Sequence, residues 1–190
     1  MTRRVVLVRH TEVARSWRGR CYGISDMGLS LAGLKGARAL VDAWDVPDVD
    51  LIVHSGLRRA AILAVMLSRR IGVGLVADVD WRERDFGSWE GRTWHSIWRE
   101  TGAEMDGMTT NPGSFRPGGG ETTDELIARS RRAWSRLPAV GCIAVVSHGG
   151  PIAAIRSVHQ GGITSEISAC VPPLGSMTIV ARDGHGDPRA

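Results

Sequence analysis

Three short apolar runs of the chain are each followed by residues that can hold an anion. The residues are Arg9-His10-Thr11 after the run 5–8, His54, Ser55 and Arg58 after the run 51–53, and Ser147-His148-Gly149-Gly150-Pro151 after the run 143–146. Arginine binds phosphate and carboxylate oxygens through paired hydrogen bonds, and histidine can act as a nucleophile or carry a proton. Two arginines and two histidines brought together would form an anion site, and a phosphoryl group fits such a set of donors.

The third of these segments carries a further device for binding an anion. Gly149 and Gly150 leave the backbone free to turn, and Pro151 suits the first position of a helix. A helix that begins there would point unpaired backbone N–H groups at the same place. This segment is therefore expected to bind the same anion.

The apolar runs themselves indicate buried strands. They are short, continuous and rich in β-branched residues, which is typical of strands buried on both faces of a sheet. Helical patterns lie between and after them, at 30–44, 57–70, 122–137 and 151–158. This alternation predicts an α/β fold, a three-layer α/β/α sandwich with a mostly parallel central sheet. Because ligands of such sheets bind beyond the carboxyl ends of the strands, the three segments are expected to converge.

The remaining segments are expected to belong to the same domain. A single domain is predicted over residues 1–181, with a last strand at 176–180 and a flexible tail at 182–190. The stretch 100–121 is rich in Gly, Pro, Thr and Asn. It is predicted to form a long loop of the kind that often carries function.

Charge and composition narrow the classes of function. Lys and Arg number 24 against 20 Asp and Glu, and all but Lys35 of the basic residues are arginines, which suits an anionic ligand. No basic run suggests a nucleic-acid groove. Cys21, Cys142 and Cys170 are widely spaced, without a Cys-x-x-Cys pair, which disfavours disulfides and a structural zinc site. No signal-peptide core or stretch of membrane-spanning length is found, so a cytoplasmic protein is expected.

Several segments together resemble the histidine phosphatase superfamily, also called phosphoglycerate mutase-like. Leu7-Val8-Arg9-His10-Thr11-Glu12 is similar to its Arg-His-Gly signature. The other segments that agree in order and spacing are 19–26 with Leu29, Ser30 and Gly33, then 55–60, 83–91, 117–121 and 146–150. The resemblance extends over residues 4–180 and implies the phosphoglycerate mutase-like fold.

The resemblance also implies a mechanism that uses no metal and no organic cofactor. Neutral His10 would attack phosphorus and form a phosphohistidine, and Glu83 would protonate the leaving oxygen and later draw a proton from water. The catalytic residues that the resemblance implies are His10, Glu83, His148, Arg9 and Arg58. The substrate-binding residues are Arg9, Thr11, Ser16, Tyr22, Gly23, Arg58, His148 and Gly149.

The position of the second arginine requires a choice. In the family it follows a Ser-Pro-Leu segment either directly or after one further residue, so Arg58 and Arg59 compete. Three positions separate Ser55 from Arg58, which on a helix would place both on one face. Arg58 is therefore the predicted residue.

The chain departs from the family pattern at three positions. Thr11 replaces a glycine, which leaves a backbone donor and adds a hydroxyl. Ser16 stands where many members have an asparagine that contacts phosphate, which puts this contact in question. Gly56 stands where the family has a proline.

The sequence indicates the type of reaction more closely than the identity of the substrate. Within the superfamily, the chain is most similar to the α-ribazole phosphatases, through residues 9–11, 21–26, Trp94 and 115–121. This similarity implies removal of the 5′-phosphate of α-ribazole phosphate in cobalamin biosynthesis. The tryptophans that would either stack on its base or pack in the core are Trp89, Trp94 and Trp98.

Other functions are weighed against this one. A broad-range sugar-phosphate or nucleotide phosphatase and a phosphoglycerate mutase would share the same catalytic residues, and a mutase would retain the phosphoryl group on His10. A non-catalytic phosphate-binding module is disfavoured because His10, Glu83 and His148 are all present. Cysteine-dependent, aspartyl-phosphate, P-loop and dinuclear-metal chemistries lack their residues. The expected partner is a small phosphomonoester, neither nucleic acid nor membrane, and a homodimer remains open.

Overall fold

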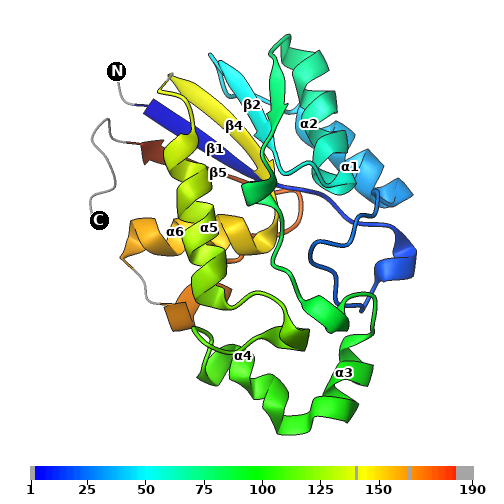
Figure 1. Ribbon diagram of the computed structural model, residues 1–190. Coiled ribbons are helices and arrows are strands. Elements are labelled where there is room, and N and C mark those ends of the chain that lie inside the picture. The colour runs from blue at the N-terminus through cyan, green and yellow to red at the C-terminus, as the bar shows by residue number, and fades with distance from the viewer. Residues whose placement is uncertain (1–2, 140, 162–163, 183–190) are drawn as a thin grey trace.

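The computed structural model describes residues 3–139, 141–161 and 164–182, and its centre is a five-stranded sheet (Figure 1). The strands are β1 (Arg3–Arg9), β2 (Leu51–His54), β3 (Leu75–Ala77), β4 (Cys142–Ser147) and β5 (Met177–Arg182), in the order β3-β2-β4-β1-β5. All pairs are parallel except β1 with β5, which is antiparallel. The predicted mostly parallel sheet is confirmed.

Helices cover both faces of this sheet, as the predicted three-layer sandwich requires. They are α1 (Leu31–Asp42), α2 (Arg58–Ile71), α3 (Trp94–Thr101), α4 (Gly107–Thr110), α5 (Thr123–Arg136) and α6 (Gly149–Gln160). Figure 1 shows α5 and α6 on one side of the sheet and α1 and α2 on the other. Helices α3 and α4 lie in an extension beyond the sheet.

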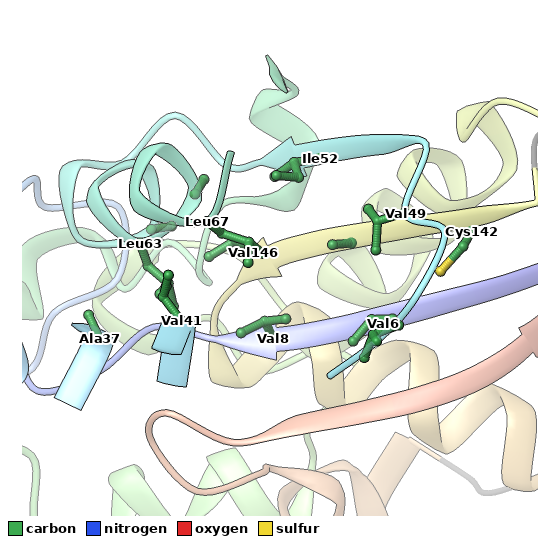
Figure 2. Close-up of a cluster of buried hydrophobic side chains, with 14 residues drawn as sticks. Val6, Val8, Ala37, Val41, Val49, Ile52, Leu63, Leu67, Cys142 and Val146 are labelled. Carbon is green, nitrogen blue, oxygen red and sulfur yellow. The ribbon is translucent and has the colours of Figure 1, made fainter. Parts of the chain in front are cut away.

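The alternation of side chains along β1 divides the core between the two faces. Val6 and Val8 point to the face covered by α1 and α2, where Leu63 and Leu67 pack (Figure 2). The alternate residues of β1, Val5 and Leu7, belong to a second cluster on the α5 and α6 face. Because successive strand residues point to opposite faces, both faces need apolar side chains, which explains the continuous apolar runs.

Local capping explains where two of the helices begin. The Ser30 hydroxyl accepts from the N–H of Gly33 at the start of α1. At the start of α5, Thr122 and Glu125 form a capping box, in which each side chain accepts from the other residue's N–H. Such caps satisfy backbone donors that the helix itself leaves unpaired.

The stretch 100–121 is not the structureless loop that was predicted. It contains the end of α3, the whole of α4 and two 3-10 turns, Gly102–Asp106 and Pro117–Gly119. A third apolar cluster, of Cys21, Trp89 and Ile97 with Phe115 and neighbours packed against it, holds this extension together. The glycine-rich sequence predicted a loop, but packing against distant residues orders this segment into helical turns.

The chain end differs slightly from the prediction. Strand β5 continues to Arg182, so this residue belongs to the sheet and not to a tail. The predicted tail from 183 to 190 lies outside the described residues. Strand β3, which the sequence did not predict, is short and has exposed positions at Val76 and Ala77.

Candidate active site

His10 follows β1 directly, at the carboxyl end of the strand. Its backbone N–H donates to the Ser147 carbonyl at 3.1 Å, and its carbonyl accepts from the N–H of Gly175 at 3.1 Å. The ring is 1% exposed, and Nδ1 lies 2.7 Å from the carbonyl oxygen of Thr11. Since that oxygen can only accept, Nδ1 carries the proton and Nε2 keeps its lone pair.

The electrostatic setting of His10 favours the neutral ring. The pKa of His10 is lowered to about 3, by burial first and then by the positive charges of Arg59 and Arg9, although the hydrogen bond with the Thr11 carbonyl raises it in part. Burial and nearby cations both disfavour an added positive charge. His10 is therefore an unprotonated nitrogen base at neutral pH.

His148 lies beside His10 at the end of the neighbouring strand. The ring centroids are 5.1 Å apart, and His148 is the N-cap residue of α6. Its Nδ1 accepts from Nε of Arg59 at 3.2 Å, so a neutral ring carries its proton on Nε2, 2.7 Å from the Ser55 hydroxyl oxygen. Burial, then the charge of Arg59, lowers the pKa of His148 well below its usual value.

The arginine beside these histidines is Arg59, and the prediction of Arg58 is wrong. The predicted spacing from Ser55 assumed a helix, but α2 begins at Arg58 and Gly56 adopts a left-handed φ of 83°. Arg58 is exposed, and its backbone N–H donates to Asp26 Oδ1 at 2.6 Å. Arg59 is fully buried at 0% exposure.

Backbone carbonyls hold the Arg59 guanidinium in place. Nη2 donates to the Gly23 carbonyl at 2.6 Å and Nη1 to the Ser25 carbonyl at 2.8 Å. The Tyr22 ring lies under the guanidinium, with 5.5 Å between its centroid and Cζ. The predicted residues Tyr22 and Gly23 are thus neighbours of Arg59, and burial raises the pKa of the Tyr22 hydroxyl.

Gly23 is required by close packing. A Cβ atom at this position would overlap the backbone carbonyl oxygen of Arg84. Because Gly23 has no side chain, it can lie against Arg84. In this position the Gly23 carbonyl accepts from Arg59.

Arg9 and Gly149 meet on the other side of His10. Nη1 of Arg9 donates to the Pro172 carbonyl at 2.5 Å, whereas its buried Nε has no hydrogen-bond partner among the described residues. A Cβ built on Gly149 would lie 3.1 Å from Cζ of Arg9. A glycine here allows the guanidinium to lie close against the start of α6.

Glu83 lies at the same helix terminus. Its Oε1 accepts from the Gly150 N–H at 3.0 Å and from the Arg84 N–H at 2.9 Å. Gly150 is two residues after His148, so the carboxyl group is held next to the histidine pair. A carboxylate is stabilised at a helix amino terminus by these N–H groups.

Two predicted binding residues contact other parts of the protein. The Thr11 hydroxyl donates to the Gly33 carbonyl at 2.8 Å, so it ties the residue after His10 to α1. Ser16 is exposed on a 3-10 turn, where its carbonyl accepts from Nε of Arg20 at 2.9 Å. Phosphate contacts by Thr11 and Ser16 stay predictions.

Three groups have partners in the site that were not predicted from the sequence. They are the Ser55 hydroxyl, which contacts His148, the Gly150 N–H, which donates to Glu83, and the Pro172 carbonyl, which accepts from Arg9. Ser55 and Gly150 lie in segments that the sequence had already singled out, but their partners are set by the fold. The Pro172 carbonyl carries no sequence signal.

A cavity of about 420 Å³ adjoins Glu83. The residues that line it are Ile24, Val79, Arg82, Glu83, Asp85, Arg116, Gly119, Gly120, Glu121 and Arg129. Its walls are mainly charged side chains and glycine backbone. Trp89 and Trp94 pack in or against the third apolar cluster, and Trp98 is 58% exposed, so core packing is the observed role of the first two.

The three cysteines are buried free thiols, as expected. Within residues 3–139, 141–161 and 164–182, no three His, Cys, Asp or Glu side chains gather in a way that could hold a metal ion. None of the helices in the described part of the chain is both long and apolar enough to cross a membrane.

Two histidines and two arginines gather at the carboxyl ends of parallel strands, which places this chain among the α/β proteins with a site for an anion at the edge of the sheet. The family model "Histidine phosphatase superfamily (branch 1)" matches residues 5–188, and the chain belongs to this superfamily. The predicted family and fold are confirmed.

Named relatives extend this result. A bifunctional protein of Mycobacterium tuberculosis is 34% identical over 155 residues, which is 78% of this chain but 42% of that protein. Glucosyl-3-phosphoglycerate phosphatase of M. tuberculosis is 33% identical over 189 residues, covering 97% of this chain and 82% of the relative. This chain therefore spans less than half of the first relative and most of the second.

Solved structures agree with the fold. The native structure of a mycobacterial glucosyl-3-phosphoglycerate phosphatase has a TM-score of 0.83 at 29% identity, covering 94% of this chain and 90% of that chain. The α-ribazole phosphatase from Shigella flexneri has a TM-score of 0.85 at 22% identity, covering 95% and 91%. At that identity, the second likeness shows the fold alone.

Proposed function

We propose that this protein hydrolyses phosphate monoesters through a phosphohistidine formed on Nε2 of His10. The observation that carries the proposal is the 2.7 Å contact between His10 Nδ1 and the Thr11 carbonyl. It keeps the proton on Nδ1, and the pKa of about 3 keeps Nε2 unprotonated. Neutral imidazole with a fixed tautomer is a competent nucleophile.

In the first step, the Nε2 lone pair of His10 attacks phosphorus and the bond to the leaving oxygen breaks. Arg9 and Arg59 supply positive charge for the equatorial oxygens, and His148 lies beside them with its one N–H directed at the Ser55 hydroxyl oxygen. Glu83, whose protonated form is favoured over the carboxylate when the dianionic ester binds beside it, gives its proton to the leaving oxygen. The products are the free alcohol, a phosphohistidine and the Glu83 carboxylate.

In the second step, the Glu83 carboxylate takes a proton from a water molecule whose oxygen attacks phosphorus. The bond between phosphorus and Nε2 breaks, and its electron pair returns to His10. Inorganic phosphate leaves and Glu83 is protonated again. The cycle needs no redox change, and every proton is accounted for by Glu83 and water.

The cavity beside Glu83 is proposed to hold the alcohol part of the ester. Its volume, about 420 Å³, lies in the range of small-molecule sites. Its lining is rich in charged groups and contains no aromatic ring among the described residues. The charged groups favour a small polar or acidic ester, whereas Ile24 and Val79 provide apolar surface for a larger alcohol such as that of α-ribazole 5′-phosphate. A cytoplasmic location and a homodimer remain proposals.

A panel of esters tests this function. Phosphate release would be measured in the presence of EDTA from 3-phosphoglycerate, p-nitrophenyl phosphate, α-ribazole 5′-phosphate and several sugar phosphates, with the wild type and His10→Asn. The proposal expects metal-independent release that falls at least about 10³-fold in the variant. Release that survives the substitution would contradict the mechanism, and transfer of phosphate between positions of phosphoglycerate would favour a mutase.

A further inference from the structure

The cavity beside Glu83 contains three arginines, two of which have partners in the protein. Arg129 forms a two-point contact with Glu121, with Nε to Oε1 and Nη2 to Oε2 both at 2.8 Å. Arg116 forms an ion pair with Glu125. The positive charge of these two side chains is therefore already balanced.

Arg82 is different from these two. Its Nε is buried and has no hydrogen-bond partner in the described parts of the chain. A buried donor without a partner costs free energy, and that cost is larger for a charged group. A Cβ built on Gly56 would lie 4.0 Å from Nη2 of Arg82, so the guanidinium lies next to the turn that follows Ser55 and leads into α2.

The carboxylates of the cavity are otherwise engaged. Glu121 is paired with Arg129, Asp85 Oδ1 accepts from the Gly87 N–H at 2.7 Å, and Glu83 accepts from two backbone N–H groups. Arg82 is thus the arginine lining this cavity whose buried Nε has no partner among the described residues, and Asp85 and Glu83 accept only from uncharged backbone N–H groups. A partner for it would have to come with the ligand.

We infer that Arg82 is a specificity-determining residue that binds a second oxyanion, carried by the alcohol part of the substrate. The inference rests on the proposed function and deepens it. Glu83 must lie near the leaving oxygen, and Arg82 precedes it in the chain and lines the same cavity. The second oxyanion therefore lies on the leaving group, a few bonds from the ester oxygen, and Arg82 binds it as arginine binds carboxylate or phosphate.

Two matched pairs of esters test this inference. 3-Phosphoglycerate and glycerol 3-phosphate share a three-carbon skeleton and differ in one carboxylate. Fructose 1,6-bisphosphate and fructose 6-phosphate differ in one phosphate. Each ester would be measured as a competitive inhibitor of p-nitrophenyl phosphate hydrolysis, which reports binding whether or not the ester is turned over.

The expected result is a ratio within each pair. The wild type should bind one of the acidic esters at least about 10-fold more tightly than its partner, as a charge-assisted hydrogen bond predicts. Arg82→Gln should bring that ratio close to one, and Arg82→Lys should keep part of it. The pair that responds identifies the oxyanion as carboxylate or phosphate. In Arg99→Gln, a control at an exposed arginine that does not line the cavity, the ratio should change less than about twofold.

The contrary results are distinct. The inference would be overturned if the wild type showed equal inhibition constants within both pairs, or if Arg82→Gln left the ratios unchanged. In either case, hydrolysis of p-nitrophenyl phosphate would still support the proposed function. If the wild type hydrolyses no ester, the proposed function fails. Calorimetric titration with the same four esters then decides the role of Arg82 by the same ratios.

Discussion

Nε of Arg59 donates a hydrogen bond to Nδ1 of His148 across 3.2 Å, joining the first turn of α2 to the residue that follows β4. The bond decides which nitrogen of His148 carries the proton in the neutral ring. It also places a fixed positive charge beside both histidines, which adds to the larger effect of burial in lowering the pKa of each. One side chain thus contributes to keeping both His10 and His148 neutral.

Replacing Arg59 should therefore remove most of the activity. Arg59→Gln is expected to lower kcat/KM by about 10²–10³-fold, as does the loss of one preorganised donor for a developing negative charge. Arg58→Gln, the adjacent and exposed control, should stay within about threefold. Steady-state kinetics with p-nitrophenyl phosphate would separate the two.

The activities of these two variants could also contradict the role assigned to Arg59. Arg59 bonds two carbonyls, so far-ultraviolet circular dichroism must first show that the variant is folded. A folded Arg59→Gln with near-normal activity, or a larger loss in Arg58→Gln, would return the role to Arg58.

Glu83→Gln should separate the two chemical steps. General acid catalysis contributes about 10²–10⁴-fold, so hydrolysis of an alkyl ester such as glycerol 3-phosphate should fall in that range. p-Nitrophenolate leaves without a proton, so the first step with that ester should remain fast. Because the second step also needs Glu83, stopped flow should show a burst of one p-nitrophenol per enzyme.

The acid assignment has a clear counter-result. If Glu83→Gln hydrolyses alkyl and aryl esters with the same relative rates as the wild type, another group protonates the leaving oxygen. Asp85→Asn would serve as a nearby control, since Asp85 accepts from the Gly87 N–H.

The convergence of the three strand-end segments was predictable from the sequence. Buried parallel strands need continuous apolar side chains, and the residues after them must meet at one edge of the sheet. The 5.1 Å between the rings of His10 and His148 and the 2.7 Å contact of His148 Nε2 with the Ser55 hydroxyl confirm this expectation.

The identity of the arginine could not be obtained in the same way. It depends on where α2 begins, which the left-handed Gly56 and the Asp26 cap of the Arg58 N–H determine. Asp26 is 32 residues away, so a local pattern cannot contain this information. The helices within 94–110 were not predicted for a similar reason, because their packing partners include the distant residue Cys21.

Gly23→Ala should destabilise the protein. Its Cβ would overlap the Arg84 carbonyl, a backbone atom that cannot move aside cheaply, and overpacking of this kind costs about 1–3 kcal/mol. Gly28→Ala is the control, because its Cβ would lie 3.8 Å from the Ile62 side chain. Urea unfolding should show a lower midpoint for Gly23→Ala alone; equal midpoints would mean that the close approach is absent.

The buried histidines should make stability depend on pH. The pKa of His10 is lowered to about 3 in the folded state from a usual value of 6.5, so between these values the unfolded chain binds the extra proton. Stability is therefore complete above about pH 6.5 and falls as pH decreases, by up to about 1.4 kcal/mol per pH unit for each such histidine. His10→Asn should reduce this slope between pH 6 and 5 by about that amount; an unchanged slope would contradict a neutral, buried His10.

The most direct test of the central claim is to trap the covalent intermediate. The enzyme would be mixed with ³²P-labelled substrate, quenched in alkali within milliseconds, and digested for mass spectrometry under conditions that preserve phosphohistidine. The account predicts a labelled peptide with phosphate on His10, which forms and decays at rates that match turnover and is absent in His10→Asn. Turnover without label, or label on another residue, would contradict it.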